Sequence, residues 1–288
     1  MSQAATQNAS KLRELAGPCR LCPRECGADR PAGETGHCGV AAAALVGSAG
    51  PHWGEESVLV GRGGSGTIFF AGCNLLCCFC QNSGLSHGRE GVEVSADELA
   101  SKMLGLERAG CVNVNFVTPT HFAHVVAEAI MTARAGGLAV PVVYNCGGYE
   151  SVEALRHLEG LVEIYMPDAK TLSAEFSRKA LGAKDYPERM REALGEMHRQ
   201  VGDLEVSGGV ARRGLLVRHL VMPGMTRDSE NVIGFLADLS DGTFVNVMGQ
   251  YRPCYRADSV AGLERRPARA EISAARAFAR DKGLRMAD

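Results

Sequence analysis

The sequence predicts an α/β protein, a partial (β/α)6 barrel that follows a cysteine-rich N-terminal extension. From about residue 65 onward, short apolar stretches of strand length alternate six times with stretches of helical periodicity. Connections of helix length imply a parallel sheet with right-handed crossovers. Six units are too few for a closed eight-stranded barrel, so we expect an open cleft with functional groups at the carboxyl ends of the strands. We place the extension, with a four-cysteine metal-binding module, at 1–60 and the barrel at 61–288.

Each element has a local signal in the sequence. Ser95 and Glu98 form a capping box that opens a helix to about residue 108. The next helix begins at Thr120 or His121 and ends at a glycine pair after residue 135. The expected strands are 67–71, 113–118, 142–146, 162–166, 215–221 and 244–248. The remaining helices are expected at 151–158, 173–201 with a break near 182–187, 229–239 and 269–280, and the glycine-rich run 61–66 is expected to be a linker or turn.

Composition favours a cytoplasmic enzyme. The first twenty residues contain no apolar segment typical of a signal peptide, so we expect the 11 cysteines to be thiols available to metals rather than disulfides. The net charge of −2 gives no reason to expect a nucleic-acid partner. No apolar run approaches the roughly 20 residues that span a bilayer, so no membrane partner is expected. The 35 glycines suit a site that backbone must approach closely.

The most informative motif is the loop that follows the first expected strand. Cys73, Cys77 and Cys80 form a C-x3-C-x2-C run. Three thiolates suit a 4Fe-4S cluster and leave one iron free to bind a small molecule and pass it an electron. The alternative is structural zinc, which usually takes four ligands. Cys78 can in principle replace Cys77, which would change the spacing to C-x4-C-x-C.

A second cysteine group lies upstream, in the expected extension. Proline and glycine between these cysteines disfavour long helices or strands, so a bound metal would supply the order that the segment needs. Four-cysteine zinc, a second iron–sulfur cluster and a loop with unused thiols all remain open. The candidate ligands are Cys19, Cys22, Cys26 and Cys38, in a C-x2-C-x3-C-x11-C pattern.

Polar residues follow the later strands at the edge where a cofactor would bind. A charged pair inside the apolar fifth strand is costly unless it is paired, so we expect Arg218 or His219 to face the cleft. The alternative for His219 is a histidine whose hydrogen bonds are satisfied in the core. Gln250, Tyr251 and Arg252 are possible substrate contacts after the sixth strand. The candidate cofactor-binding residues are Phe79, Thr118, Thr120, Asn145, Asp168, Lys170 and His219.

The cysteine spacing, with the aromatic Phe79 before the third cysteine, resembles the signature of the radical S-adenosylmethionine (SAM) enzymes. The resemblance implies that the open iron chelates the methionine part of SAM, and that reduction cleaves SAM to methionine and a 5′-deoxyadenosyl radical. Relatives often carry Gly-Gly-Glu after the second strand to bind the SAM amino group. Here Thr118-Pro-Thr120 stands instead, and threonine hydroxyls or backbone carbonyls can accept the same hydrogen bonds.

Further motifs resemble the pyruvate formate-lyase-activating enzymes, and more narrowly the PflX-like proteins. They are the N-terminal cysteines, VTPTH, YNCGGYE, YMPDAK, RHLVMPG and MGQYRP. This resemblance implies that Asp168, Lys170 and His219 lie near SAM or an associated cation. It also implies a flavodoxin or ferredoxin reductant, and a glycyl radical enzyme as the activated partner. Leu76, where relatives often have a basic residue, and Cys78 depart from the pattern but keep the three-cysteine spacing.

Two other functions remain open at this point. One is a radical SAM enzyme that acts on a small molecule or on another kind of protein. The other is a non-enzymatic iron–sulfur or zinc protein that transfers electrons or mediates an interaction. A spectroscopic response of the cluster to SAM would distinguish them, because an electron carrier has no need of SAM.

Overall fold

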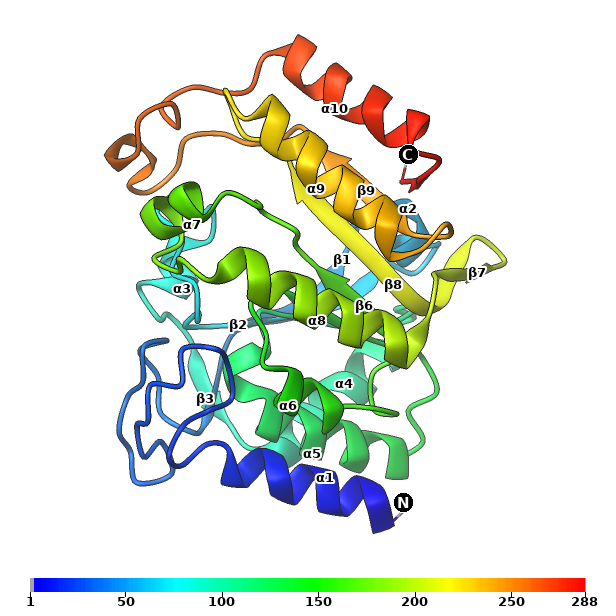
Figure 1. Cartoon of the computed structure of the whole chain (residues 1–288). Helices are drawn as coiled ribbons and strands as arrows, with labels where there is room; N and C mark the ends of the chain where they lie inside the picture. Colours follow the sequence, from blue (N-terminus) through cyan, green and yellow to red (C-terminus); the bar gives the residue numbers. More distant parts are fainter. Residues whose placement is uncertain (1–2, 288) are drawn as a thin grey trace.

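The computed structural model describes residues 3–287 and has a mostly parallel sheet at its centre. Six parallel strands lie side by side in the order β2-β4-β5-β6-β8-β9, which confirms the expected α/β fold. Figure 1 shows the helices packed along the outer side of these strands. The six strands are β2 (Ser65–Phe70), β4 (Val114–Val117), β5 (Val142–Cys146), β6 (Ile164–Pro167), β8 (Val210–Leu220) and β9 (Phe244–Met248).

Short strands that the sequence did not predict extend both edges of the sheet. β1 (Ala44–His52) runs antiparallel to β2, and β3 (Val92–Val94) runs antiparallel to β1. At the other edge β10 (Arg285–Met286) pairs with β9, while β7 (Glu205–Ser207) forms a hairpin with β8. The sheet therefore stays open between β3 and β10. A domain boundary at residue 60 stays a prediction, and β1 before it pairs with β2 after it.

The principal expected helices are present, with small shifts at their ends. The capping box is confirmed, because Glu98 N donates to Ser95 Oγ at 3.2 Å and Ser95 N donates to Glu98 Oε2 at 2.8 Å. The expected turn at 61–66 is too long, since β2 already begins at Ser65. The helices after β2 are α3 (Ser83–Ser86), α4 (Ala96–Arg108), η1 (Thr120–Phe122), α5 (Ala123–Ala135), α6 (Val152–Arg156), α7 (Ala174–Ala180), α8 (Tyr186–Val201), α9 (Thr226–Leu239), η2 (Ala257–Ser259) and α10 (Arg269–Asp281).

Two further helices precede β2. α1 (Gln3–Glu14) packs along α5, and α2 (Ser57–Val60) packs against β8. Neither was expected from the sequence. Within residues 3–287, no helix combines the length and the apolar character that crossing a membrane requires.

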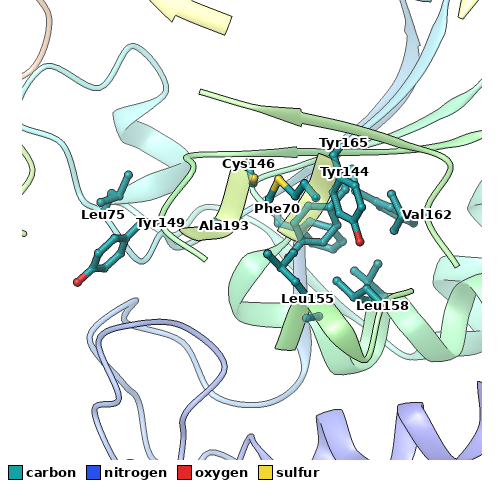
Figure 2. Close-up of a cluster of buried hydrophobic side chains, with 14 of the residues drawn as sticks. Phe70, Leu75, Tyr144, Cys146, Tyr149, Leu155, Leu158, Val162, Tyr165 and Ala193 are labelled. Carbon is teal, nitrogen blue, oxygen red and sulfur yellow. The ribbon is translucent and has the colours of Figure 1, made fainter. Parts of the chain in front are cut away.

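Side chains alternate between the two faces of the sheet and build two apolar clusters. On the outer face, Tyr144 and Tyr165 pack with Leu155 and Leu158, as Figure 2 shows. On the inner face, Leu59 of α2 packs with a smaller set of strand residues, so α2 fills the amino-terminal end of the barrel. That inner set is Val143, Ile164, Met166, Leu204, Ala211, Leu216 and Phe244. Space for a ligand is therefore left at the carboxyl ends of the strands.

One carboxylate is buried on the outer face of the sheet. Glu150 is 3% exposed, accepts a hydrogen bond from Thr120 Oγ1 at 2.7 Å, and accepts another from the Tyr144 hydroxyl at 3.4 Å. Among the residues that the structure describes, no cation forms an ion pair with it. Burial raises the pKa of Glu150 to about 7, although the hydrogen bonds oppose the shift.

This raised pKa predicts a pH-dependent stability. Between its ordinary value near 4.5 and about 7, folded Glu150 holds a proton that the unfolded chain has released, so the free energy of unfolding falls as pH rises. Glu150→Gln has no such titration. The stability of the wild type relative to this variant should fall by about 3 kcal/mol across that window. Urea denaturation of both proteins from pH 5 to 8 measures it.

The control is Glu153→Gln, which changes a largely exposed carboxylate on α6. Its stability should follow the wild type at every pH. Parallel curves for the wild type and Glu150→Gln would contradict the raised pKa.

Candidate functional site

A cavity of about 300 Å³ opens at the carboxyl ends of the central strands. This is the position that the strand–helix repeat predicts for a site. Side chains with the same inward orientation on neighbouring strands form its wall. Five of the six strands supply at least one, and Asp168 follows directly after the remaining strand, β6: Phe69 from β2, Val117 from β4, Asn145 from β5, Arg218 and Leu220 from β8, and Met248 from β9.

The loop after β2 places three cysteines in this cavity. Cys73, Cys77 and Cys80 all line it, whereas Cys78 does not. The backbone explains the difference, because Leu76 adopts a positive φ of 53° and Cys78 N donates to Ala180 O on the other side of the loop. Of the two spacings that the sequence left open, the geometry therefore favours C-x3-C-x2-C.

The surroundings of the three sulfurs suit thiolates. Leu75 N lies 3.4 Å from Cys73 Sγ as a donor, and the Ser86 hydroxyl lies 3.1 Å from Cys80 Sγ. Burial raises the pKa of the Cys73 and Cys77 thiols, so a bound cation is needed to deprotonate them.

Three cysteines around one cavity suit a cluster better than a single ion. In residues 3–287, no three histidine, cysteine, aspartate or glutamate side chains converge as they would around one metal ion. A 4Fe-4S cluster is wider than one ion and holds its thiolates further apart. Cys73, Cys77 and Cys80 would therefore hold three irons of the cluster and leave the fourth without a protein ligand.

A buried charge network forms another part of the cavity wall. Asp168 accepts a hydrogen bond from Lys170 Nζ at 2.6 Å and another from Arg218 Nε at 3.0 Å. Burial alone would raise the pKa of Asp168, but the two cations outweigh it and hold that pKa below its ordinary value. Asp168 in turn raises the pKa of Lys170 against the effect of burial. All three groups therefore stay charged in the cavity wall.

The network continues toward the amino-terminal end of the barrel. Arg218 donates to Asn145 Oδ1 at 2.7 Å and lies 3.5 Å from Glu55. The neighbouring Glu56 accepts a hydrogen bond from Asn246 at 2.8 Å. The sequence analysis missed both glutamates, because it expected no element before β2 to enter the barrel. The sequence signal that could have found them is weak: Glu55 and Glu56 stand directly before the apolar residues of α2.

Five of the seven expected cofactor-binding residues surround the cavity: Phe79, Thr118, Asn145, Asp168 and Lys170. Thr118 has a φ of 61°, which is unusual for a β-branched residue and reverses the chain at the end of β4. Its N–H donates to Asn145 O at 2.8 Å. Backbone strain of this kind is concentrated at functional sites.

The other two expected residues, Thr120 and His219, do not reach the cavity. His219 follows Arg218 on β8, so alternation turns it to the outer face of the sheet. There its ring nitrogens contact Ala169 O at 2.7 Å and Ser229 Oγ at 2.9 Å. Thr120 is bound to buried Glu150. We therefore correct the expectation that Thr120 and His219 face a cofactor.

Of the three possible substrate contacts after the sixth strand, one lines the cavity and two do not. Gln250 lines the cavity, but Tyr251 is buried with its hydroxyl donating to Leu263 O, and Arg252 is exposed. Gln81 and Asn82 also line the cavity and were not anticipated. The four N-terminal cysteines lie outside this cavity. Cys19, Cys22 and Cys38 are buried, and Cys26 is exposed.

Solved structures share this fold at low sequence identity. The crystal structure of Streptococcus suis SuiB bound to S-adenosylmethionine is similar with a TM-score of 0.54 and 11% identity, over 75% of this chain and 47% of SuiB. A second crystal structure of SuiB is similar with a TM-score of 0.50 and 13% identity, over 75% of this chain and 46% of SuiB. The chain thus spans just under half the length of these proteins, and the likeness shows the fold alone.

Sequence comparisons identify the family. An uncharacterized protein of Methanocaldococcus jannaschii is 31% identical over 265 residues, which cover 89% of this chain and 72% of the relative. The model of the radical SAM superfamily matches residues 67–236, a stretch that contains the cysteine loop and the Asp168 network. The protein therefore belongs to the radical SAM superfamily, whose members are enzymes that use a 4Fe-4S cluster and S-adenosylmethionine.

Proposed function

We propose that this enzyme cleaves SAM reductively at the cavity and uses the resulting radical to abstract a hydrogen atom. The observation that carries the proposal is that three loop cysteines and a buried lysine surround one cavity. When bound, the 4Fe-4S cluster supplies one electron, which breaks a carbon–sulfur bond of SAM and leaves methionine and a 5′-deoxyadenosyl radical. Cys73, Cys77 and Cys80 would hold this cluster.

The cavity side chains would position SAM. Lys170 donates one of its three N–H groups to Asp168, which leaves donors for the SAM carboxylate. At the end of β4, the Thr118 hydroxyl or carbonyl can accept from the SAM amino group. Arg218 is tied to Asp168, Asn145 and Glu55, so it fixes the wall rather than binding freely. Phe79 contributes apolar surface beside the third cysteine.

Replacement of two adjacent cysteines tests the site. Cys77→Ala should abolish both the SAM-dependent change in the EPR signal of the reduced cluster and the formation of 5′-deoxyadenosine, because the cluster loses a ligand. Cys78→Ala is the matched control and should retain both, since Cys78 lies outside the cavity. Protein reconstituted anaerobically with iron and sulfide and reduced with dithionite serves for both measurements. Loss of activity in Cys78→Ala with retention in Cys77→Ala would reverse the ligand assignment.

Lys170→Ala tests the binding of the SAM carboxylate. Loss of a charge-assisted hydrogen bond should raise the dissociation constant of SAM by about 10- to 100-fold, as measured by calorimetry on the reconstituted protein. Lys179→Ala, which removes an exposed lysine paired with Glu175, should leave it unchanged. Equal affinity in wild type and Lys170→Ala would remove Lys170 from the binding site.

For the hydrogen donor we propose a glycine of a partner protein, which would become a glycyl radical. The support is the similarity of the YMPDAK and RHLVMPG segments to pyruvate formate-lyase-activating enzymes, including the PflX-like group. A cytoplasmic flavodoxin or ferredoxin would then supply the electron. Radical transfer to a small molecule is the competing proposal.

The nature of the acceptor can be tested by fractionating an extract of the source cells under anaerobic conditions. A protein acceptor predicts that the macromolecular fraction stimulates 5′-deoxyadenosine formation and acquires a glycyl radical EPR signal. The low-molecular-weight filtrate should have no effect. Stimulation by the filtrate alone would contradict the protein acceptor and favour a small molecule. Cys77→Ala controls for deoxyadenosine formed by other enzymes.

A further inference from the structure

The segment between α1 and β1 is folded without helix or strand, and it contains four cysteines. Two of their sulfurs lie near Gly36, because a methyl group there would lie 2.8 Å from Cys26 Sγ and 3.9 Å from Cys38 Sγ. Cys19 and Cys22 are buried in the same segment, whereas Cys26 is exposed. Cysteines drawn together in a segment with little other structure are typical of a metal module, because metal binding supplies the folding energy.

A buried cation lies beside these thiols. Arg30 is 1% exposed and donates to His121 O at 2.5 Å and to Ala41 O at 2.6 Å. In the part of the chain that the structure describes, no carboxylate forms an ion pair with Arg30, and its Nε atom has no hydrogen-bond partner. Its Nη1 atom lies 3.9 Å from Cys19 Sγ.

Burying an uncompensated guanidinium is costly, so buried charges normally have a partner of opposite sign. The acidic group in contact with Arg30 is the Cys19 thiol, which is anionic only as a thiolate. Several thiolates in one buried place require a metal to offset their repulsion. The position of Arg30 is therefore explained if the cysteines carry a metal.

We propose that Cys19, Cys22, Cys26 and Cys38 bind a second metal centre through four thiolates, with Arg30 as its buried counter-cation. Binding releases the four thiol protons. A single zinc ion and a 4Fe-4S cluster both leave an excess of negative charge on four thiolates, which Arg30 partly offsets. Metal analysis of the loaded protein distinguishes the two centres, because a cluster adds iron and sulfide and the single ion adds one zinc.

The module also contacts the loop of the first cluster. A methyl group on Gly72 would lie 2.9 Å from Cys38 O, so the two backbones touch next to Cys73. Arg24 Nε donates to Asn74 O at 2.9 Å. Figure 1 shows the segment at the end of the sheet toward which the central strands point. The second centre thereby braces the loop that carries the first cysteine of the active site.

The test measures metal in a protein that has lost the first site. Cys73→Ser, Cys77→Ser and Cys80→Ser are combined in the full chain, which is loaded anaerobically either with iron and sulfide or with zinc. After desalting, metal content should be about four irons or about one zinc per chain. Iron retention identifies a cluster, zinc retention a single ion, and either supports the centre. No retained metal from either loading overturns it, independently of SAM cleavage.

Variants of the module locate the retained metal. Adding Cys22→Ser and Cys38→Ser should remove it, while adding Cys254→Ser, which lies outside both cysteine groups, should not. Because replacing buried cysteines can prevent folding, Cys26→Ser is a second test at an exposed position. It should speed metal loss to a chelator with an unchanged circular dichroism spectrum. If neither Cys26→Ser nor the Cys22→Ser/Cys38→Ser pair changed metal retention, the four cysteines would not be the ligands.

Discussion

The geometry of the cavity depends on the pair of hydrogen-bonded ion pairs that the Asp168 carboxylate forms with Lys170 and Arg218. The carboxylate joins the end of β6 to β8, and Arg218 extends the connection to Asn145 on β5 and to Glu55 before α2. Removing one member of a buried ion pair typically costs 3–5 kcal/mol, because the remaining charge has no partner. The network therefore constrains three strands and keeps a cation in the cavity wall. A site that binds a zwitterionic ligand needs such fixed charges before the ligand arrives.

The cysteine loop is supported by one local contact and by two contacts from the N-terminal segment. Ser86 donates to Cys80, Arg24 from the N-terminal segment donates to Asn74, and the backbone of Cys38 packs against Gly72. The cysteine loop is thus contacted by α3 and by the segment between α1 and β1. These contacts give a physical reason why that segment, which has no helix or strand, lies at the carboxyl ends of the strands (Figure 1).

Local patterns were sufficient to predict the central strands, the main helices and the face of the sheet that carries the site. The C-x3-C-x2-C spacing and the Asp168–Lys170 pair lie within short segments, so they were visible in the sequence. His219 was misplaced because neighbouring strand residues face opposite sides, and the sequence did not fix the register that turns Arg218 inward. Glu55 was missed because its place in the barrel depends on the tertiary packing of α2. β1 and β3 were missed because their apolar signals are weak: much of β1 and two of the three residues of β3 are exposed.

In the proposed site, an open iron of the cluster would face the same cavity as Lys170. Electron–nuclear double resonance on the reduced, reconstituted enzyme tests this directly, with SAM labelled by 15N at its amino group and by 17O at its carboxylate. Direct chelation predicts hyperfine coupling of both labels to the cluster, and loss of both couplings in Cys77→Ala. Bound SAM without coupling from either label would place it away from the cluster and contradict the arrangement of the site.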